Sequence, residues 1–504
     1  MRAALHCCEY DEQKLIFETE INREETLELV VPDVCADVSA VLDTRGQLLL
    51  ASKKAGDGMV LVSASVDVRV ICATEDGRTE CVSGVIPFDL NIPAEGVTEN
   101  ASPLVRCRLR CVEARPLNPR RLLLRAEADF CIEVFAAEKI SLCDKAAAEE
   151  RKLHLLQKSY ESCPVRSLRD KSFSITDEYT LSAEWGRNLK LLSTGTELRV
   201  IDVKGVGSKL IIKAQADTTA VFCNVDDGKL FSTRFSTAFS QIIEVEADGE
   251  DFDDTVFLQL RDAEFTCLPG RENGFAVSVQ LYVTAQAVRR QSCRRTYVAD
   301  AYSNACPLKV GTAQIRASLQ PERRELRFDM QEKLPQKTPL SEIGYLALTT
   351  VSAEGETGAV TVRARLSGTG TDADGMPAPV SMELYARQEV EARPGARLTV
   401  LTVLADAPAV LGAAGEASVM LSVTVVYSLS ESMEITAVTS LEAGEEMLAS
   451  AHGPSLVVLC SQREYDLWAL AKKYGSTMEA IRAANGGSES FSVSQRPLLI
   501  PRSE

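Results

Sequence analysis

Apolar and polar residues alternate strictly along three well-separated stretches of the chain, and an Asp-Gly pair follows each stretch. The stretches are residues 62–68, 212–216 and 360–366. Side chains of a strand point alternately to its two faces, so this pattern predicts antiparallel strands with one face on a core. The glycines Gly77, Gly228 and Gly375 lie 151 and 147 residues apart, a spacing that predicts a domain-sized repeat.

Each predicted repeat also ends in a similar way. Residues 124–134, 275–285 and 419–425 alternate again, and the joining segments 160–164 and 302–307 both run from Tyr to Cys-Pro. Many short strands separated by Gly, Pro and Asp turns favour a β-sandwich for each repeat, although a half-barrel would give the same pattern. We therefore expect a mainly β protein with three tandem antiparallel β-sandwich-like repeats. Their expected bounds are residues 1–163, 164–306 and, for the most diverged copy, 307–449.

A short linker helix is expected at the end of the first repeat. Residues 144–157 are rich in Ala, Glu, Lys and Leu, which are strong helix formers.

The last part of the chain, residues 452–504, follows a different period. Leu467, Leu470, Ala471 and Tyr474 form one apolar stripe of a helix that Gly475 ends. Met478, Ile481 and Ala484 supply the stripe of a second helix, which Ser476 or Thr477 can cap and the sequence Asn485-Gly486-Gly487 can stop. Apolar runs at 456–459 and 498–500 flank the two helices, so the predicted order is strand, helix, helix, strand.

These C-terminal residues resemble a LysM module. The similarity lies in residues 467–474, in Ile481 and Asn485, and in the closing run 498–501. The resemblance implies two helices on a two-stranded sheet, and the family commonly binds N-acetylglucosamine glycans. Two loops depart from the family: residues 464–466 replace its Gly-Asp-Thr, and residues 494–496 replace its Pro-Gly-Gln. Since the sugar groove uses close backbone approach at those glycines, the departures favour a different ligand.

Three β-rich repeats in front of one LysM module resemble the SipL-type spore-coat morphogenetic proteins of clostridial endospore formers. Residues 31–38, with the sequence Val-Pro-Asp-Val-Cys-Ala-Asp-Val, also resemble the opening motif of that family. The resemblance implies that the LysM module binds the ATPase-type morphogenetic protein of the coat basement layer. It also implies a place in the mother-cell cytoplasm, at the forespore surface.

Composition narrows the class of partner. The formal net charge of −17 disfavours nucleic acid, because a nucleic-acid binder neutralises phosphates with a basic surface. No run of 18 apolar residues and no secretory signal is found, so we expect a cytoplasmic protein without a transmembrane segment. The 15 cysteines are thinly spread and odd in number, and we expect reduced thiols.

Candidate chemistry is sparse. The three histidines are His6, His154 and His452, and His6 beside Cys7 and Cys8 is too compact for the usual zinc spacing. Residues 205–209 superficially resemble a phosphate-binding loop, but a serine separates glycine from lysine, so a hairpin turn is expected.

The charged clusters suggest no binding site either. The acidic run 244–254 is interpreted as a solvated loop. The arginines at 289–290 and 294–295 are expected to form inter-domain salt bridges rather than an anion site.

We therefore expect no catalytic residue, no cofactor and no metal. The expected function is that of a non-enzymatic scaffold or adaptor, which contacts its partner through the LysM loops. Trp468 is expected either to pack in the core or to anchor an interface. The alternative is a peptidoglycan-binding protein of cell wall or cortex, and exposed edge strands would also permit self-association. The expected partner-binding or glycan-binding residues are Arg463, Glu464, Tyr465, Asp466, Trp468, Asn485, Ser494, Gln495 and Arg496.

Overall fold

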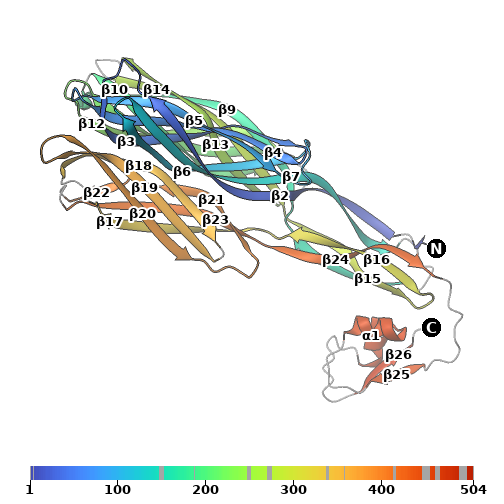
Figure 1. Cartoon of the computed structure of the whole chain (residues 1–504). Helices are drawn as coiled ribbons and strands as arrows, with labels where there is room; N and C mark the ends of the chain where they lie inside the picture. The colour runs from blue at the N-terminus through green and yellow to red at the C-terminus, as the bar shows by residue number, and fades with distance from the viewer. Residues whose placement is uncertain are drawn as a thin grey trace.

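The computed structural model of the chain is mainly β, and its described residues form antiparallel sheets and two short α-helices (Figure 1). A broad head of sheets tapers into a narrower bundle of ribbons, and the two helices lie beside the far end of those ribbons. The structure describes residues 2–3, 5–146, 153–186, 188–246, 251–269, 275–335, 340–356, 358–412, 416–444, 455–459, 466–486 and 497–502.

Three sheets of the head have the same simple order, in which each strand pairs with the next one along the chain. The nine strands are β3 (Val38–Gly56), β4 (Met59–Thr74), β5 (Thr79–Pro93), β10 (Leu189–Val206), β11 (Lys209–Asn224), β12 (Leu230–Glu244), β18 (Leu340–Glu356), β19 (Ala359–Asp372) and β20 (Pro377–Glu389). The alternating stretches of the sequence fall on the central strands β4, β11 and β19. The Gly205–Lys209 segment is the β10–β11 turn, so the hairpin prediction is confirmed.

Two further sheets lie against these three. One has the order β13-β14-β9-β2-β7-β6, and the other has the order β17-β23-β21 with β22 paired to β23. Their strands are β2 (Leu5–Val30), β6 (Ser102–Asn118), β7 (Arg121–Ala146), β9 (Val165–Leu181), β13 (Phe252–Pro269), β14 (Phe275–Gln291), β17 (Glu322–Lys333), β21 (Arg397–Ala405), β22 (Ala409–Leu411) and β23 (Ser418–Ser430). A 3-10 turn, η1 (Ala183–Trp185), follows β9.

The largest core shows why alternation produces this packing. Val62 and Val66 of β4 are at most 2% exposed and belong to the same apolar cluster as Leu124 and Phe130 of β7. Every second residue of each strand therefore faces the opposite sheet, and the intervening residues face outward or toward a neighbouring sheet.

The ribbons are made by strand ends, by four additional strands and by the short strand β1. Strand β8 (Leu153–Ser162) pairs with β15 (Cys293–Ser303), and β16 (Leu308–Ser318) pairs with β24 (Ser432–Ala443), on which β1 (Arg2–Ala3) also lies. They pack with the ends of β2 and β7 around a shared apolar core that includes Leu142, Tyr160, Tyr297 and Ile435. Residues from the beginning, middle and end of the long β-rich part thus share one small core.

The predicted linker helix is wrong where it can be checked. Residues 144–146 belong to β7 and residues 153–157 belong to β8, while residues 147–152 lie outside the described part of the chain. Leu153 and Leu155 pack in the ribbon cluster around Val298 and Leu441. Contacts with distant strands therefore override the helix propensity of this segment.

The arginines at 289–290 and 294–295 form the predicted inter-domain salt bridges only in part. Arg295 of β15 pairs with Glu12 of β2 at 3.0 Å, which joins two ribbons. Arg289, only 1% exposed, instead pairs with Asp254 of the neighbouring strand β13 at 2.8 Å, inside one sheet. The acidic run that contains Asp254 is therefore not wholly solvated.

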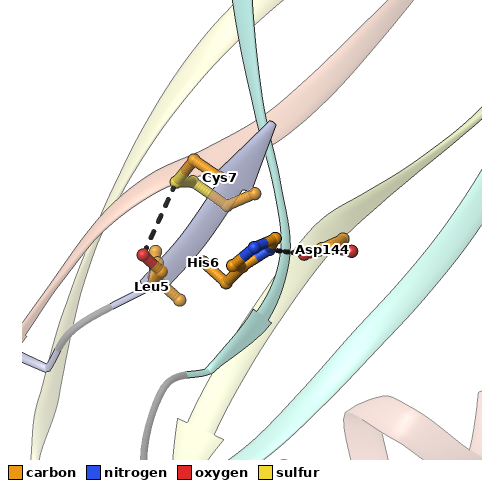
Figure 2. Close-up of a disulfide and its surroundings, with 5 residues drawn as sticks. Leu5, His6, Cys7 and Asp144 are labelled. Atoms are coloured by element: carbon orange, nitrogen blue, oxygen red, sulfur yellow. Dashed lines mark hydrogen bonds and ion pairs between the residues drawn. A yellow bond between two sulfur atoms is a disulfide. The ribbon is translucent and has the colours of Figure 1, made fainter. Parts of the chain in front are cut away.

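The expectation of reduced thiols fails for one pair. Cys7 of β2 and Cys143 of β7 form a disulfide, with Cα atoms 3.9 Å apart (Figure 2). The two cysteines are 136 residues apart in sequence but directly opposed in the strand register. Only the register of the two long strands reveals the pair.

Edge strands from all the head sheets meet around a central cavity of about 490 Å³. The strands that line it include β3, β6, β10, β13, β18 and β21, each of which is the outer strand of its sheet. Unpaired edge carbonyls need hydrogen-bond donors, and long polar side chains supply them here. Arg45 donates to Leu348 O at 2.9 Å, Arg106 to Val400 O at 2.9 Å, and Arg108 to Ala353 O at 2.8 Å.

The pairing of Arg45 with Asp43 yields a stability prediction. Asp43 is fully buried, and it accepts hydrogen bonds from Arg45 at 2.9 Å and from the Tyr345 hydroxyl at 2.7 Å. Arg45→Met leaves a buried carboxylate without its cation and should destabilise the head by about 3–5 kcal/mol, measured by urea unfolding. Arg327→Met, which removes an exposed pair with Asp329, should leave the urea midpoint almost unchanged. Equal effects of the two variants would contradict this account of the head.

Candidate functional site

The C-terminal unit consists of strand β25 (Leu456–Leu459), helix α1 (Leu467–Tyr474), helix α2 (Met478–Ala484) and strand β26 (Leu498–Pro501). The two strands pair antiparallel. Leu470, Ala471, Ile481, Leu498 and Ile500 form the small core between the helices and this sheet. The predicted order of strand, helix, helix and strand is present.

Local capping explains where the two helices begin and where α1 ends. The Asp466 side chain accepts a hydrogen bond from the backbone N–H of Trp468 at 3.0 Å, and Thr477 accepts one from Ala480 at 3.0 Å. Gly475 ends α1 in the left-handed conformation, with φ of 66°. Of the two cap candidates for α2, Thr477 takes the role. Ser476 is fully buried and its hydroxyl donates to the carbonyl of Pro501.

Asn485 is used inside the unit. Its side-chain amide donates to Ile481 O at 2.7 Å and to Leu499 O at 2.6 Å, and its side-chain oxygen accepts from Leu499 N at 2.8 Å. These three bonds fasten the end of α2 to β26. The expected binding residue Asn485 thus has a structural role in the unit.

The unit is docked on ribbon strand β15 through one face of α1. Trp468 is 7% exposed, and its indole N–H donates to Asp300 Oδ2 at 2.8 Å. Lys472, one helical turn further, donates to both oxygens of Asp300 at 2.8 Å. The Trp468 ring also lies edge-on to the Tyr302 ring, with centroids 4.9 Å apart. Trp468 therefore belongs to the unit's core and to its contact with the ribbon at once.

Tyr302 completes the contact. Its hydroxyl donates to the backbone carbonyl of Ser476 at 2.7 Å, in the turn between the two helices. Its ring packs against His154 of the paired strand β8 at a centroid distance of 4.8 Å. The docked surface thus combines an aromatic contact, an ion pair and a buried hydrogen bond. This arrangement matches that of many stable interfaces.

Burial and hydrogen bonding set the charges of this contact. Burial by itself would raise the pKa of Asp300, but hydrogen bonds from Lys472 and Trp468 outweigh it and lower that pKa below its ordinary value of 3.8. Burial raises the pKa of Tyr302 to about 12 and lowers the pKa of His154. At neutral pH the contact therefore holds a charged carboxylate, a neutral phenol and a neutral imidazole.

The structure describes three of the nine expected binding residues. Asp466 caps α1, Trp468 docks on β15 and Asn485 ties α2 to β26, so these three serve separate local roles. The other six lie outside the described residues: Arg463, Glu464, Tyr465, Ser494, Gln495 and Arg496.

Sequence reasoning missed the ribbon side of the contact. Asp300 and Tyr302 lie where the repeated joining segment begins, but the resemblance of Tyr302 to Tyr160 gives no hint of their different partners. Tyr160 packs against Tyr297 in the ribbon core, whereas Tyr302 contacts the C-terminal unit. Only the folded arrangement distinguishes the two tyrosines.

The central cavity of the head holds polar groups that are already engaged with protein partners. The Cys107 thiol donates to Gln259 at 3.0 Å, and burial raises the pKa of Cys107 to about 12, so this thiol is protonated at neutral pH. Asp217 is paired with Arg199 at 2.8 Å and with Arg234 at 3.1 Å. A thiol with so high a pKa is a poor nucleophile.

Comparisons with protein-family models, with curated proteins and with solved structures found no match to this chain. Among the described residues, neither helix has the length and apolar character required to cross a bilayer.

The docking contact predicts a measurable effect of Asp300. Asp300→Ala removes a charged acceptor shared by Trp468 and Lys472, and should weaken docking by about 1.5–3 kcal/mol. The readout is Trp468 emission in a Trp185→Phe background, where undocking exposes the indole and shifts its emission to the red. Asp329→Ala, which removes an exposed pair far from the C-terminal unit, is the matched control and should leave the emission unchanged. An unshifted spectrum for Asp300→Ala would show that this contact does not hold the unit.

The lowered pKa of Asp300 also predicts a pH dependence. A carboxylate whose pKa is lower in the folded state stabilises that state fully above the ordinary value of 3.8, and this contribution is lost as pH falls through the lowered value. An acid titration of Trp468 emission should therefore show a transition below pH 3.8 that Asp300→Asn lacks. Because His154 also titrates at this contact, the difference between the two proteins isolates Asp300. Superimposable titrations of the two proteins would be inconsistent with this role.

Proposed function

We propose that this chain is a non-enzymatic scaffold or adaptor of endospore coat assembly. In this proposal three homologous β-sandwich-like repeats carry a C-terminal LysM module, which binds the ATPase-type morphogenetic protein of the coat basement layer. The complex would lie at the forespore surface, on the mother-cell side. The resemblance of residues 31–38 and 467–501 to that class of proteins supplies the identity of the partner.

The recurrence of one sheet plan supports the repeat part of the proposal. Gly77, Gly228 and Gly375 each adopt positive φ, of 77°, 71° and 79°, in the turn that follows a central strand. Since this conformation favours glycine, the three Asp-Gly turns meet one backbone requirement at equivalent places. Duplication of one ancestral unit accounts for that recurrence most simply.

One observation carries the scaffold part of the proposal: the C-terminal unit is held against β15 by Trp468, Lys472 and the turn at Ser476. A recognition module on a free tether would need no buried contact of this kind. Docking fixes the orientation of the unit at the end of the ribbons, remote from the head (Figure 1). A partner bound by the unit would meet a preset orientation, which lowers the entropic cost of association.

The protein contacts of Trp468 limit which part of the C-terminal unit can bind a ligand. Its indole is only 7% exposed, and Asp300 accepts its N–H. The indole is thus already committed to protein contacts, and a ligand would have to be bound elsewhere on the unit. The two loops around Arg463–Tyr465 and Ser494–Arg496 remain the proposed binding surface, and their lack of the family's glycines favours a polypeptide.

The experiment uses the full-length chain with two triple variants: R463A/E464A/Y465A and S494A/Q495A/R496A. Each should weaken binding of the purified basement-layer protein at least tenfold, measured by surface plasmon resonance, because the proposed contact surface is truncated. Lys473→Ala, which changes an exposed residue of α1, is the matched control and should stay within twofold.

Unchanged binding by both triple variants would contradict the proposal. Titration of N-acetylglucosamine oligomers into the same proteins tests the alternative ligand. Saturable micromolar binding that the triple variants abolish would assign the module to glycan instead.

A further inference from the structure

Three possible metal ligands of different chemical types meet at the start of β2 and the end of β7. They are the imidazole of His6, the thiol of Cys8 and the carboxylate of Asp144, and one ligand atom from each lies within 4.8 Å of the others. His6 Nδ1 and Asp144 Oδ1 are 2.8 Å apart, across 138 residues of sequence (Figure 2). The compact sequence around His6 lacked zinc spacing because one of these groups comes from a distant strand.

A shift of register brings the three groups together. Cys7 pairs with Cys143 and His6 pairs with Lys145, so Asp144 is an additional residue in β7 at this point. Such a bulge redirects a side chain that would otherwise follow the normal alternation. The Cys7–Cys143 disulfide ties the two backbones together beside the bulge, and Figure 2 shows His6 and Asp144 facing each other next to it. The two strands that carry the ligands are therefore held in a fixed register.

A contribution to the stability of the two strands does not explain why His6, Cys8 and Asp144 lie together. The His6 side chain is 63% exposed and that of Asp144 is 24% exposed, and ion pairs at such exposure contribute little to folding. The long β2–β7 ladder and the disulfide already join the strands without them. The coincidence of imidazole, thiol and carboxylate needs a different explanation.

We propose that His6, Cys8 and Asp144 form a binding site for a divalent transition-metal ion, with Zn²⁺ the best match. Zn²⁺ takes imidazole nitrogen, thiolate sulfur and carboxylate oxygen, and a site with three protein ligands keeps a fourth position for water. Ligand atoms on one tetrahedral Zn²⁺ lie about 3.5 Å apart, so the 4.8 Å spread must close by about 1.3 Å and the 2.8 Å contact of His6 with Asp144 must open by about 0.7 Å. The exposed His6 side chain can rotate by that amount, and its exposure leaves the site accessible to the ion.

Binding has a defined proton balance. The ion binds the lone pair of His6 Nδ1, so the neutral imidazole carries its hydrogen on Nε2 and Asp144 Oδ1 faces the ion instead of an N–H. The Cys8 thiol releases its proton to water and becomes a thiolate ligand. No oxidant or reductant takes part, because Cys7 and Cys143 remain joined. The disulfide positions the strands and is not itself a ligand.

The test uses the full-length chain under non-reducing conditions, with Co²⁺ as a spectroscopic probe and Zn²⁺ affinity measured by competition with a chelating dye. We expect a thiolate-to-cobalt charge-transfer band that Cys8→Ser abolishes. We also expect Zn²⁺ affinity to fall at least tenfold in His6→Ala and in Asp144→Asn. Cys267→Ser, which changes an exposed free cysteine on β13, is the matched control and should alter neither quantity.

Two results would overturn the site. One is a charge-transfer band that persists in Cys8→Ser, and the other is a Zn²⁺ affinity that His6→Ala leaves unchanged. Circular dichroism of each variant verifies that the sheets remain folded, and Asp144→Asn preserves the size of the side chain if the alanine variant of His6 is unstable.

Discussion

The architecture depends on how the edges of its sheets are satisfied. A sheet edge exposes unpaired backbone groups that invite pairing with another chain, and this molecule turns several such edges toward one another around a central cavity. Arg45, Arg106 and Arg108 then cross the gaps and donate to carbonyls of edge strands from another part of the chain. Gln286 donates to the carbonyl of Val105 at 2.6 Å and accepts from its backbone N–H at 3.0 Å. Polar side chains thus bridge the head sheets around the cavity, beside an apolar cluster that joins β3, β10 and β18 through Leu42, Leu192 and Tyr345.

The strands that leave the head determine how the ribbons and the C-terminal unit are arranged at the other end of the molecule. Strands β2 and β7 leave the head as a paired ribbon, and the ribbons β8–β15 and β16–β24 pack beside it on a shared apolar core. Because the ribbons are braced by one another, β15 can present Asp300 and Tyr302 as a firm surface for the C-terminal unit. The buried indole of Trp468 joins the two parts. The position of the proposed recognition module therefore follows from the packing of strands far from it in sequence.

Local patterns in the sequence predicted local structure well. The alternation in β4 and β7 predicted their buried faces, and the apolar stripe and Gly475 predicted helix α1. What the sequence could not reveal are features that depend on pairing between distant strands. The segment around Leu153 has high helix propensity but pairs with β15, and the partners Cys7 and Cys143 meet only in the register of two long strands. The docking of Trp468 on Asp300 is of the same kind, since nothing in either segment indicates that these two residues meet.

The central claim is that the C-terminal unit binds its partner while it stays docked on the ribbon. Amide hydrogen exchange of the full-length chain, with and without the basement-layer protein, tests this most directly. The account predicts new protection in residues 463–466 and 494–496, with unchanged slow exchange in residues 298–302 of β15. Protection confined to the head sheets, or faster exchange in residues 298–302 on binding, would contradict it.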